Sequence, residues 1–179
     1  MNRARSRTRL GAGAMVVACL IASPGIGGAQ AADPSPFLDP TFGEGGLALA
    51  DFTTGEDGAN AVDIGSDGSI VATGFGGLGD PSRPHVAGFA FAKYLSSGSP
   101  DLGFSGDGRA LVDFGFVNQA ATTADIDSAD RVVATGTITT FDGSTSSIGI
   151  ARLLPEGTPD PGFGDDGMVA IQPGTLSAS

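Results

Sequence analysis

The octapeptide DPTFGEGG occupies residues 39–46, and two close variants of it, DLGFSGDG and DPGFGDDG, occupy residues 101–108 and 160–167. All three share the pattern D-x-x-F-x-x-x-G, and the residue after the Phe is Gly in the first and third and Ser105 in the second. Such an Asp accepts backbone N–H bonds from two residues further on, and the last Gly permits a positive φ. The Phe contributes on the order of 2–3 kcal/mol where its side chain is buried. The pattern therefore predicts a tight joint that occurs three times, with its Phe inside.

The joints belong to a longer repeat, because the sequences between them also correspond in order. The first strand of the unit is written GLALADF at 46–52 and GRALVDF at 108–114, an offset of sixty-two residues. The last is written GFAFAKYLSSGSPD at 88–101 and SIGIARLLPEGTPD at 147–160, an offset of fifty-nine. A unit of about 60 residues with four short strands is typical of one propeller blade.

The segments within each unit are predicted to be strands joined by turns. In the first unit, AVDI and SIVATGF flank Asp67-Gly68, a pair that favours a type I′ hairpin. Ala129-Asp130 takes the same place in the second unit. No segment after residue 31 has helical periodicity over three turns, so the sequence predicts an all-β chain.

The fourth strand of each unit predicts how the sheets stack. One of its faces is bulky and the other is almost bare, which suits close packing between neighbouring sheets. The bulky face carries Phe89, Phe91 and Lys93 in the first unit and Ile148, Ile150 and Arg152 in the second. The bare face carries Ala90 and Ala92, matched by Gly149 and Ala151.

These motifs, in this order and spacing, resemble the bacterial delta-60 repeat family over residues 38–171. The resemblance implies β-propeller-like repeats of uncharacterised function, and it brings no catalytic residues with it. Members usually carry enough repeats to close a ring. Here two complete units are followed by a third joint and one strand, MVAI at 168–171.

The expected fold is therefore all-β: tandem four-stranded antiparallel repeats of about 60 residues, propeller-blade-like but too few for a closed ring. The repeat domain is expected to span 32–171, followed by a C-terminal tail at 172–179. Its parts are repeat 1 at about 38–99, repeat 2 at about 100–158 and a partial repeat 3 at about 159–171.

Residues 1–31 have the features of a secretory signal peptide. Four arginines and no acid precede an apolar run, and Ala29-Gln30-Ala31 is a suitable cleavage site. We therefore expect a secreted or extracellular protein. The alternative is a lipoprotein, because Val16-Val17-Ala18-Cys19 resembles a lipobox in which Cys19 would be lipidated.

Charge restricts the partners. Cleavage after Ala31 would remove four of the nine basic residues and none of the twenty acids, which leaves a net charge of −15. Nucleic acid and anionic membrane fit such a surface poorly, because phosphates attract Lys and Arg. We expect no membrane association unless Cys19 is lipidated, and possible self-association through exposed blade faces.

Candidate catalytic and metal-binding residues all have simpler interpretations. His85, the only histidine, lies in a loop without a recognisable triad. Asp125, Asp127 and Asp130 form DIDSAD, which resembles part of a calcium loop but lacks its Gly and Glu, so a turn is favoured. The recurrent acids Asp51 and Asp113 are interpreted as caps of strand ends. We therefore expect no catalytic site, metal or cofactor.

The function expected from these features is a secreted, non-enzymatic binding or structural module with an unknown protein or carbohydrate ligand. The variable segments at 76–88 and 137–149 fall at the same point of each unit and are the candidate ligand surface. Two alternatives remain open: an extracellular carboxylate-dependent hydrolase acting on polysaccharide, and a truncated fragment of a longer propeller.

Overall fold

The computed structural model describes residues 15–18, 38–52, 56–77, 87–140 and 143–172. Every regular element among them is a β-strand, as the sequence predicts. No helix in this part of the chain is long and apolar enough to cross a membrane.

The strands follow the order of the predicted units. Those of the N-terminal half are β1 (Met15–Ala18), β2 (Leu47–Ala50), β3 (Gly58–Ile64), β4 (Ile70–Gly77), β5 (Ala87–Tyr94) and β6 (Arg109–Val112). Those of the C-terminal half are β7 (Asn118–Ala121), β8 (Asp125–Ile126), β9 (Val132–Thr139), β10 (Ser146–Leu153) and β11 (Met168–Ile171).

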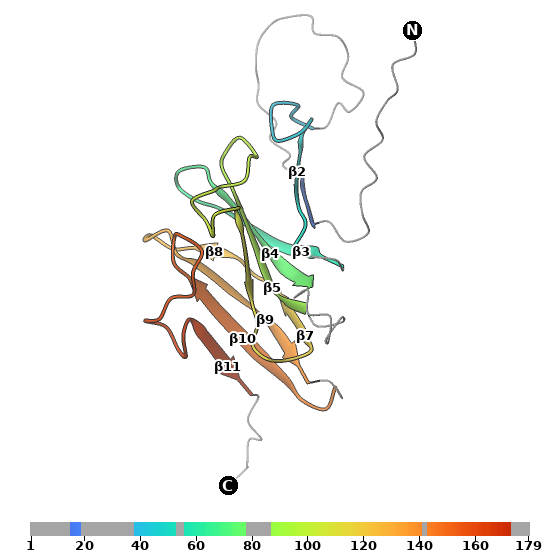
Figure 1. Cartoon of the computed structure of the whole chain (residues 1–179), viewed down its shortest axis with the longest axis vertical. Coiled ribbons are helices and arrows are strands. Elements are labelled where there is room, and N and C mark those ends of the chain that lie inside the picture. The colour runs from blue at the N-terminus through green and yellow to red at the C-terminus, as the bar shows by residue number, and fades with distance from the viewer. Residues whose placement is uncertain (1–14, 19–37, 53–55, 78–86, 141–142, 173–179) are drawn as a thin grey trace, which may run out of the picture.

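These strands form two main antiparallel sheets, neither of them closed (Figure 1). We call the sheet β3-β4-β5-β6 blade 1, and the sheet β7-β9-β10-β11, with β8 also paired to β9, blade 2. Each blade combines the second, third and fourth strands of one repeat with the first strand of the next. The joint is therefore the segment that ties one repeat to its neighbour.

The joints have the predicted geometry. The N–H groups of Thr41, Gly103 and Gly162 donate to the carboxylates of Asp39, Asp101 and Asp160, at 2.9, 2.9 and 2.8 Å. The last glycines have the expected positive φ, +93° at Gly46, +83° at Gly108 and +87° at Gly167. The same turn occurs at all three joints, because its backbone requires an Asp at the start and a Gly at the end.

Two of the three joint phenylalanines are buried, and the expectation for the third is wrong. Phe42 and Phe104 are 3% and 0% exposed, and each ring lies against a hairpin glycine: a Cβ added at Gly98 or Gly157 would meet that ring at 3.0 Å. Phe163 is half-buried. The described residues that follow it contain no fourth strand and hairpin of its own repeat to cover the ring.

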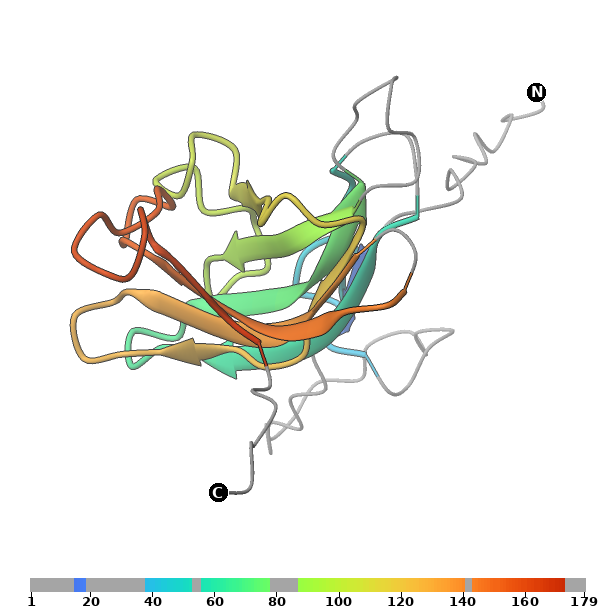
Figure 2. The ribbon, with the colours of Figure 1, turned by 90° about the horizontal axis from the view of Figure 1, so that it is seen from below.

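Blade 1 and blade 2 stack by fitting the bulky face of one onto the bare face of the other (Figure 2). Phe89 and Phe91 are fully buried between the blades. A Cβ added at Gly149 would lie 3.1 Å from Phe89 and 3.2 Å from Phe114, so the bare position makes room for both rings. The two rings are themselves in contact, with centroids 4.9 Å apart. The stacking predicted from the fourth strand is confirmed.

The hairpin between β3 and β4 is not the predicted type I′ turn. Of the pair Asp67-Gly68 only Gly68 has a positive φ, +84°. Its N–H donates to the Gly65 carbonyl, and the Gly65 N–H donates to the Ser69 carbonyl. The loop is therefore longer by one residue, a type I turn followed by one left-handed residue, and only that last position favours glycine. Asp130 takes it in blade 2, with φ +57°.

β1 lies inside the segment expected to be a signal peptide. It pairs antiparallel with β2, from Met15 opposite Ala50 to Ala18 opposite Leu47. The pairing gives β2 a partner strand that neither blade supplies.

If the joint holds the repeats together, replacing a buried joint phenylalanine has a large cost. Phe104→Ala is expected to lower the free energy of unfolding by about 3–5 kcal/mol, because it leaves a cavity in the core. Chemical denaturation monitored by circular dichroism measures the change. Phe163→Ala is the matched control and is expected to cost clearly less, because its ring is already half-exposed. Equal losses at the two positions would contradict this account.

Candidate functional site

The described residues at the base of the two variable segments lie at the same end of the blades, which we call the loop end. The Ala87 N–H donates to the Val117 carbonyl and the Val117 N–H donates to the Thr139 carbonyl, so residue 117 touches the base of both segments. The predicted range 76–88 includes strand residues of β4 and β5, and 78–86, with His85, lies outside the described residues. The range 137–149 likewise includes parts of β9 and β10, and its turn is closed by the bond from the Thr140 N–H to the Thr145 carbonyl.

At the loop end, Asp113 is a cap, as predicted. One of its carboxylate oxygens accepts the Gly115 N–H at 2.7 Å and the Gln119 side-chain N–H at 2.6 Å. Gln119 is buried, and its amide oxygen accepts the Phe114 N–H at 2.7 Å. The acid and the amide together hold the connection between β6 and β7.

In the first repeat this capping role falls to Asp57, a residue that the sequence analysis missed. Its carboxylate accepts the N–H groups of Phe52 at 3.0 Å and Gly77 at 3.2 Å. Burial raises the pKa of Asp57, and its two backbone bonds act in the opposite direction. Asp51 is exposed. The signal was available, since Asp57 and Gln119 both stand six residues after the Asp of the repeated Asp-Phe pair.

Asp127 and Asp130 of DIDSAD lie in a turn, as predicted, whereas Asp125 lies in the strand β8. The Asp127 carboxylate accepts the backbone N–H of Ala129 at 2.8 Å and that of Arg131 at 3.1 Å. It also pairs with the Arg131 guanidinium at 2.6 Å. The side-chain bond from Arg131 and the backbone bonds lower the pKa of Asp127. Within the described ranges, no group of three or more His, Cys, Asp or Glu residues could hold a metal ion.

The fourth strands carry cations that bind the following joint. The Arg152 Nε donates to Asp160 at 2.7 Å, and the guanidinium lies 4.5 Å from the centre of the Phe163 ring. Lys93 stands at the equivalent position, 3.6 Å from Asp101. The bond from the Gly162 N–H, together with Arg152, lowers the pKa of Asp160 below its ordinary value of 3.8. The charges of this bulky face therefore have a structural role.

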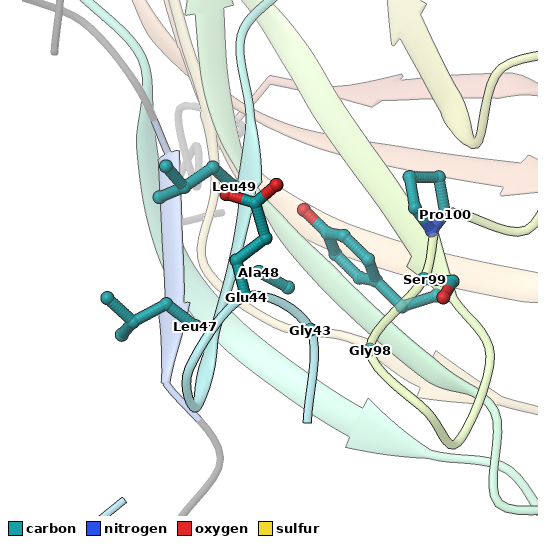
Figure 3. A pocket seen from close by; sticks show the side chains of 9 residues that line it. Gly43, Glu44, Leu47, Ala48, Leu49, Gly98, Ser99 and Pro100 are labelled. Atoms are coloured by element: carbon teal, nitrogen blue, oxygen red, sulfur yellow. The ribbon is translucent and has the colours of Figure 1, made fainter. Parts of the chain in front are cut away.

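A cavity of about 510 Å³ lies on the outer side of blade 1 (Figure 3). Gly43, Glu44 and residues 47–49 line it on the β2 side, and residues 98–100 line it on the opposite side. Tyr94 lies between them, 2% exposed, and its hydroxyl has no hydrogen-bond partner among the described residues. Burial raises the pKa of this hydroxyl to about 12. The cavity can take an apolar group that bonds one neutral hydroxyl; its single acid, Glu44, gives it no pair of carboxylates.

Comparison with known proteins gives one match. The model of a family described as a domain of unknown function (DUF5122) beta-propeller matches residues 130–163, which run from the turn before β9 to the third joint. This stretch is similar to a β-propeller repeat of unknown function. No curated protein and no solved structure matches the chain.

The ion pair at the third joint predicts a pH dependence of stability. Because the pKa of Asp160 is lower in the folded chain than in the unfolded one, its contribution is complete above pH 3.8 and is lost as pH falls through the folded-state pKa. Asp160→Asn is therefore expected to lower Tm at neutral pH and to flatten the fall of Tm as the pH drops below 3.8. Thermal melts across that range measure it. A variant that loses Tm on acidification as steeply as the parent would contradict the assignment.

The buried hydroxyl of Tyr94 gives a second prediction. Tyr94→Phe removes a hydroxyl that has no hydrogen-bond partner among the described residues. Burying a hydroxyl without a hydrogen bond costs about 1–3 kcal/mol, and the substitution removes that cost. The variant is expected to be at least as stable as the parent in urea unfolding. A loss of more than about 1 kcal/mol would show that the hydroxyl makes a stabilising bond.

Proposed function

We propose that the chain is a delta-60-type repeat protein, secreted, and that it acts as a non-enzymatic binding or structural module. The observation that carries the proposal is the use of its acids. Asp57, Asp113, Asp127 and Asp160 all bond backbone N–H groups of turns and strand ends. Carboxylates that accept hydrogen bonds from backbone N–H groups stabilise turns, a role that fits a scaffold better than a catalytic centre.

The loop end is the proposed ligand surface. Both variable segments, and the capped connection between β6 and β7, meet there on rigid strands, an arrangement common to binding scaffolds. The net charge of −15 expected after signal removal disfavours nucleic acid, so the proposed ligand is a protein or a carbohydrate.

Self-association is the second part of the proposal. Blade 2 leaves the side chain of Ile148 49% exposed on its bulky face, the equivalent of Phe89, which is fully buried in blade 1. We expect this exposed apolar face to pack against a blade of another molecule, as the equivalent face of blade 1 packs against blade 2.

The proposal is tested by replacing the loops. The exported protein and a variant with short Gly-Ser links in place of residues 78–86 and 140–145 are compared by affinity electrophoresis in a panel of soluble polysaccharides and by pull-down with secreted proteins of the same cells. The parent is expected to be retarded or captured, and the variant is expected to lose this while its urea unfolding stays unchanged. Binding that survives the replacement, or a variant that no longer folds, would contradict the loop end as the binding surface.

The competing hydrolase hypothesis has its own test. Asp51→Asn, Asp113→Asn, Asp125→Asn and Asp127→Asn variants are assayed for release of reducing sugar from the same polysaccharides. Hydrolysis by the parent that any one of these changes abolishes, with folding intact, would favour the enzyme over the binding module.

A further inference from the structure

β2 is a first strand without a blade of its own. In the two blades, the first strand of a repeat pairs with the fourth strand of the repeat before it: β6 pairs with β5, and β11 pairs with β10. β2 is the equivalent strand of repeat 1, and it packs Ala48 and Ala50 onto the bare face of blade 1. No fourth strand from a preceding repeat is present among the described residues, so one edge of β2 requires another partner.

β1 fills that place in the same register as a true fourth strand. Met15 lies opposite Ala50, just as Phe89 lies opposite Val112 and Ile148 lies opposite Ile171. β1 also lies beside β3, as β5 lies beside β7. The edge of β2 therefore accepts a strand of defined direction and register, and the signal segment satisfies it.

If the signal is removed as expected, this edge opens. The unpaired N–H and C=O groups of an edge strand are a template for another strand. Leu49 is already 43% exposed there, while Ala48 and Ala50 are kept in place by their packing on blade 1.

The opposite end of the molecule carries a suitable strand, β10. Its bulky face is open, with Ile148 49% exposed, and its edge is covered by β11, where Ile171 is 45% exposed. β11 belongs to the joint whose phenylalanine, Phe163, is half-buried, whereas β2 belongs to the joint whose Phe42 is 3% exposed. Joint 1 is also anchored, by the Gly43 N–H bond to the Ser97 carbonyl at 2.8 Å. We therefore expect β2 to be held in place more firmly than β11, and to be the better partner strand for β10.

We infer that processed copies of this chain join head to tail, with β2 of one copy replacing β11 on β10 of the next. The inference rests on the self-association part of the proposed function and is independent of the loop-end ligand. The expected register places Ala50 opposite Ile148 and Ala48 opposite Ile150. Asp39 then takes the place of Asp160 beside Arg152.

The same contact accounts for exposed apolar side chains at the other end. Val62 and Ile64 on β3 are 58% and 60% exposed. Ile126, the counterpart of Ile64, packs between the blades and donates its backbone N–H to Asp63 at 2.7 Å. In the assembly, Ile64 meets blade 2 of the neighbouring copy and its N–H faces Asp125, the counterpart of Asp63.

Such a contact is heterologous, so it forms a ring where the rotation closes and a filament where it does not. Propellers close with roughly four to eight blades, which corresponds to roughly two to four copies of two blades each.

Disulfide trapping tests the register. Ala48→Cys and Ile150→Cys are combined in the exported protein, in a background carrying Cys19→Ser, and the N-terminus is verified by mass spectrometry. Directly opposite residues have Cβ atoms about 4.5–5.5 Å apart, close enough for a disulfide with little adjustment. Blade 1 separates the two positions within one copy, so the expected product is a disulfide between copies, seen on non-reducing gels.

The matched control combines Ala48→Cys with Thr137→Cys, which lies opposite Ile148 on β9, one strand further from the proposed partner. It is expected to cross-link at least tenfold less. The unprocessed full-length chain, in which β1 covers β2, is also expected to cross-link at least tenfold less than the exported form. An exported chain ending at Gly167, without β11, is expected to cross-link several-fold faster because the competing strand is gone.

The outcomes separate the two levels of the proposal. An exported parent whose light-scattering mass stays that of one chain at high concentration overturns self-association and this inference together. An oligomer that forms no disulfide between positions 48 and 150, nor in a second pair, Ala50→Cys with Ile148→Cys, overturns the strand exchange alone. As a control, each double-cysteine variant in its reduced form must have the same circular dichroism spectrum and the same solution mass as the parent. If one of the two cysteine pairs fails this control, the result of the other pair is used.

Discussion

The fold depends on the burial of one aromatic ring at each of the first two joints. Phe104 is completely buried against the hairpin glycine Gly157, and the Ser105 N–H donates to the Glu156 carbonyl at 2.7 Å beside it. This contact joins the start of repeat 2 to its end, about fifty residues later in the chain. The strands are short, two to eight residues each, so the position of each blade also depends on its joint.

The polar residues around the joints support the same packing. Arg152 and Lys93 lie on the bulky face of a fourth strand, and each pairs with the Asp of the following joint. The Arg152 guanidinium also lies over the phenylalanine ring of that joint. Capping carboxylates and amides satisfy the backbone at the loop end. An acidic chain can accumulate a large negative charge under these conditions, because many of its acids bond backbone N–H groups that would otherwise lack partners.

A two-blade unit also presents two unlike ends. One end has a first strand that needs a fourth strand, and the other has a fourth strand with an open bulky face. In the structure β1, which lies in the segment expected to be a signal peptide, covers the first of these, and the second stays exposed at Ile148. The pairing of a first strand with the preceding fourth strand inside the chain therefore shows how the two ends of separate chains would pair.

The sequence by itself determined the strands, the joints and the alternation of bulky and bare faces, because these depend on local turn chemistry and on a period of two. It also identified Asp113 and Asp127 as turn and cap residues. Only the tertiary structure decided that Phe163 is half-exposed while Phe42 and Phe104 are buried, because the covering hairpin comes from a distant part of the repeat. The same holds for Asp57, which bonds backbone groups after β2 and at the end of β4, and for the pairing of β1 with β2. A similar local sequence acquires a different environment wherever its partner is supplied, or left out, by residues far along the chain.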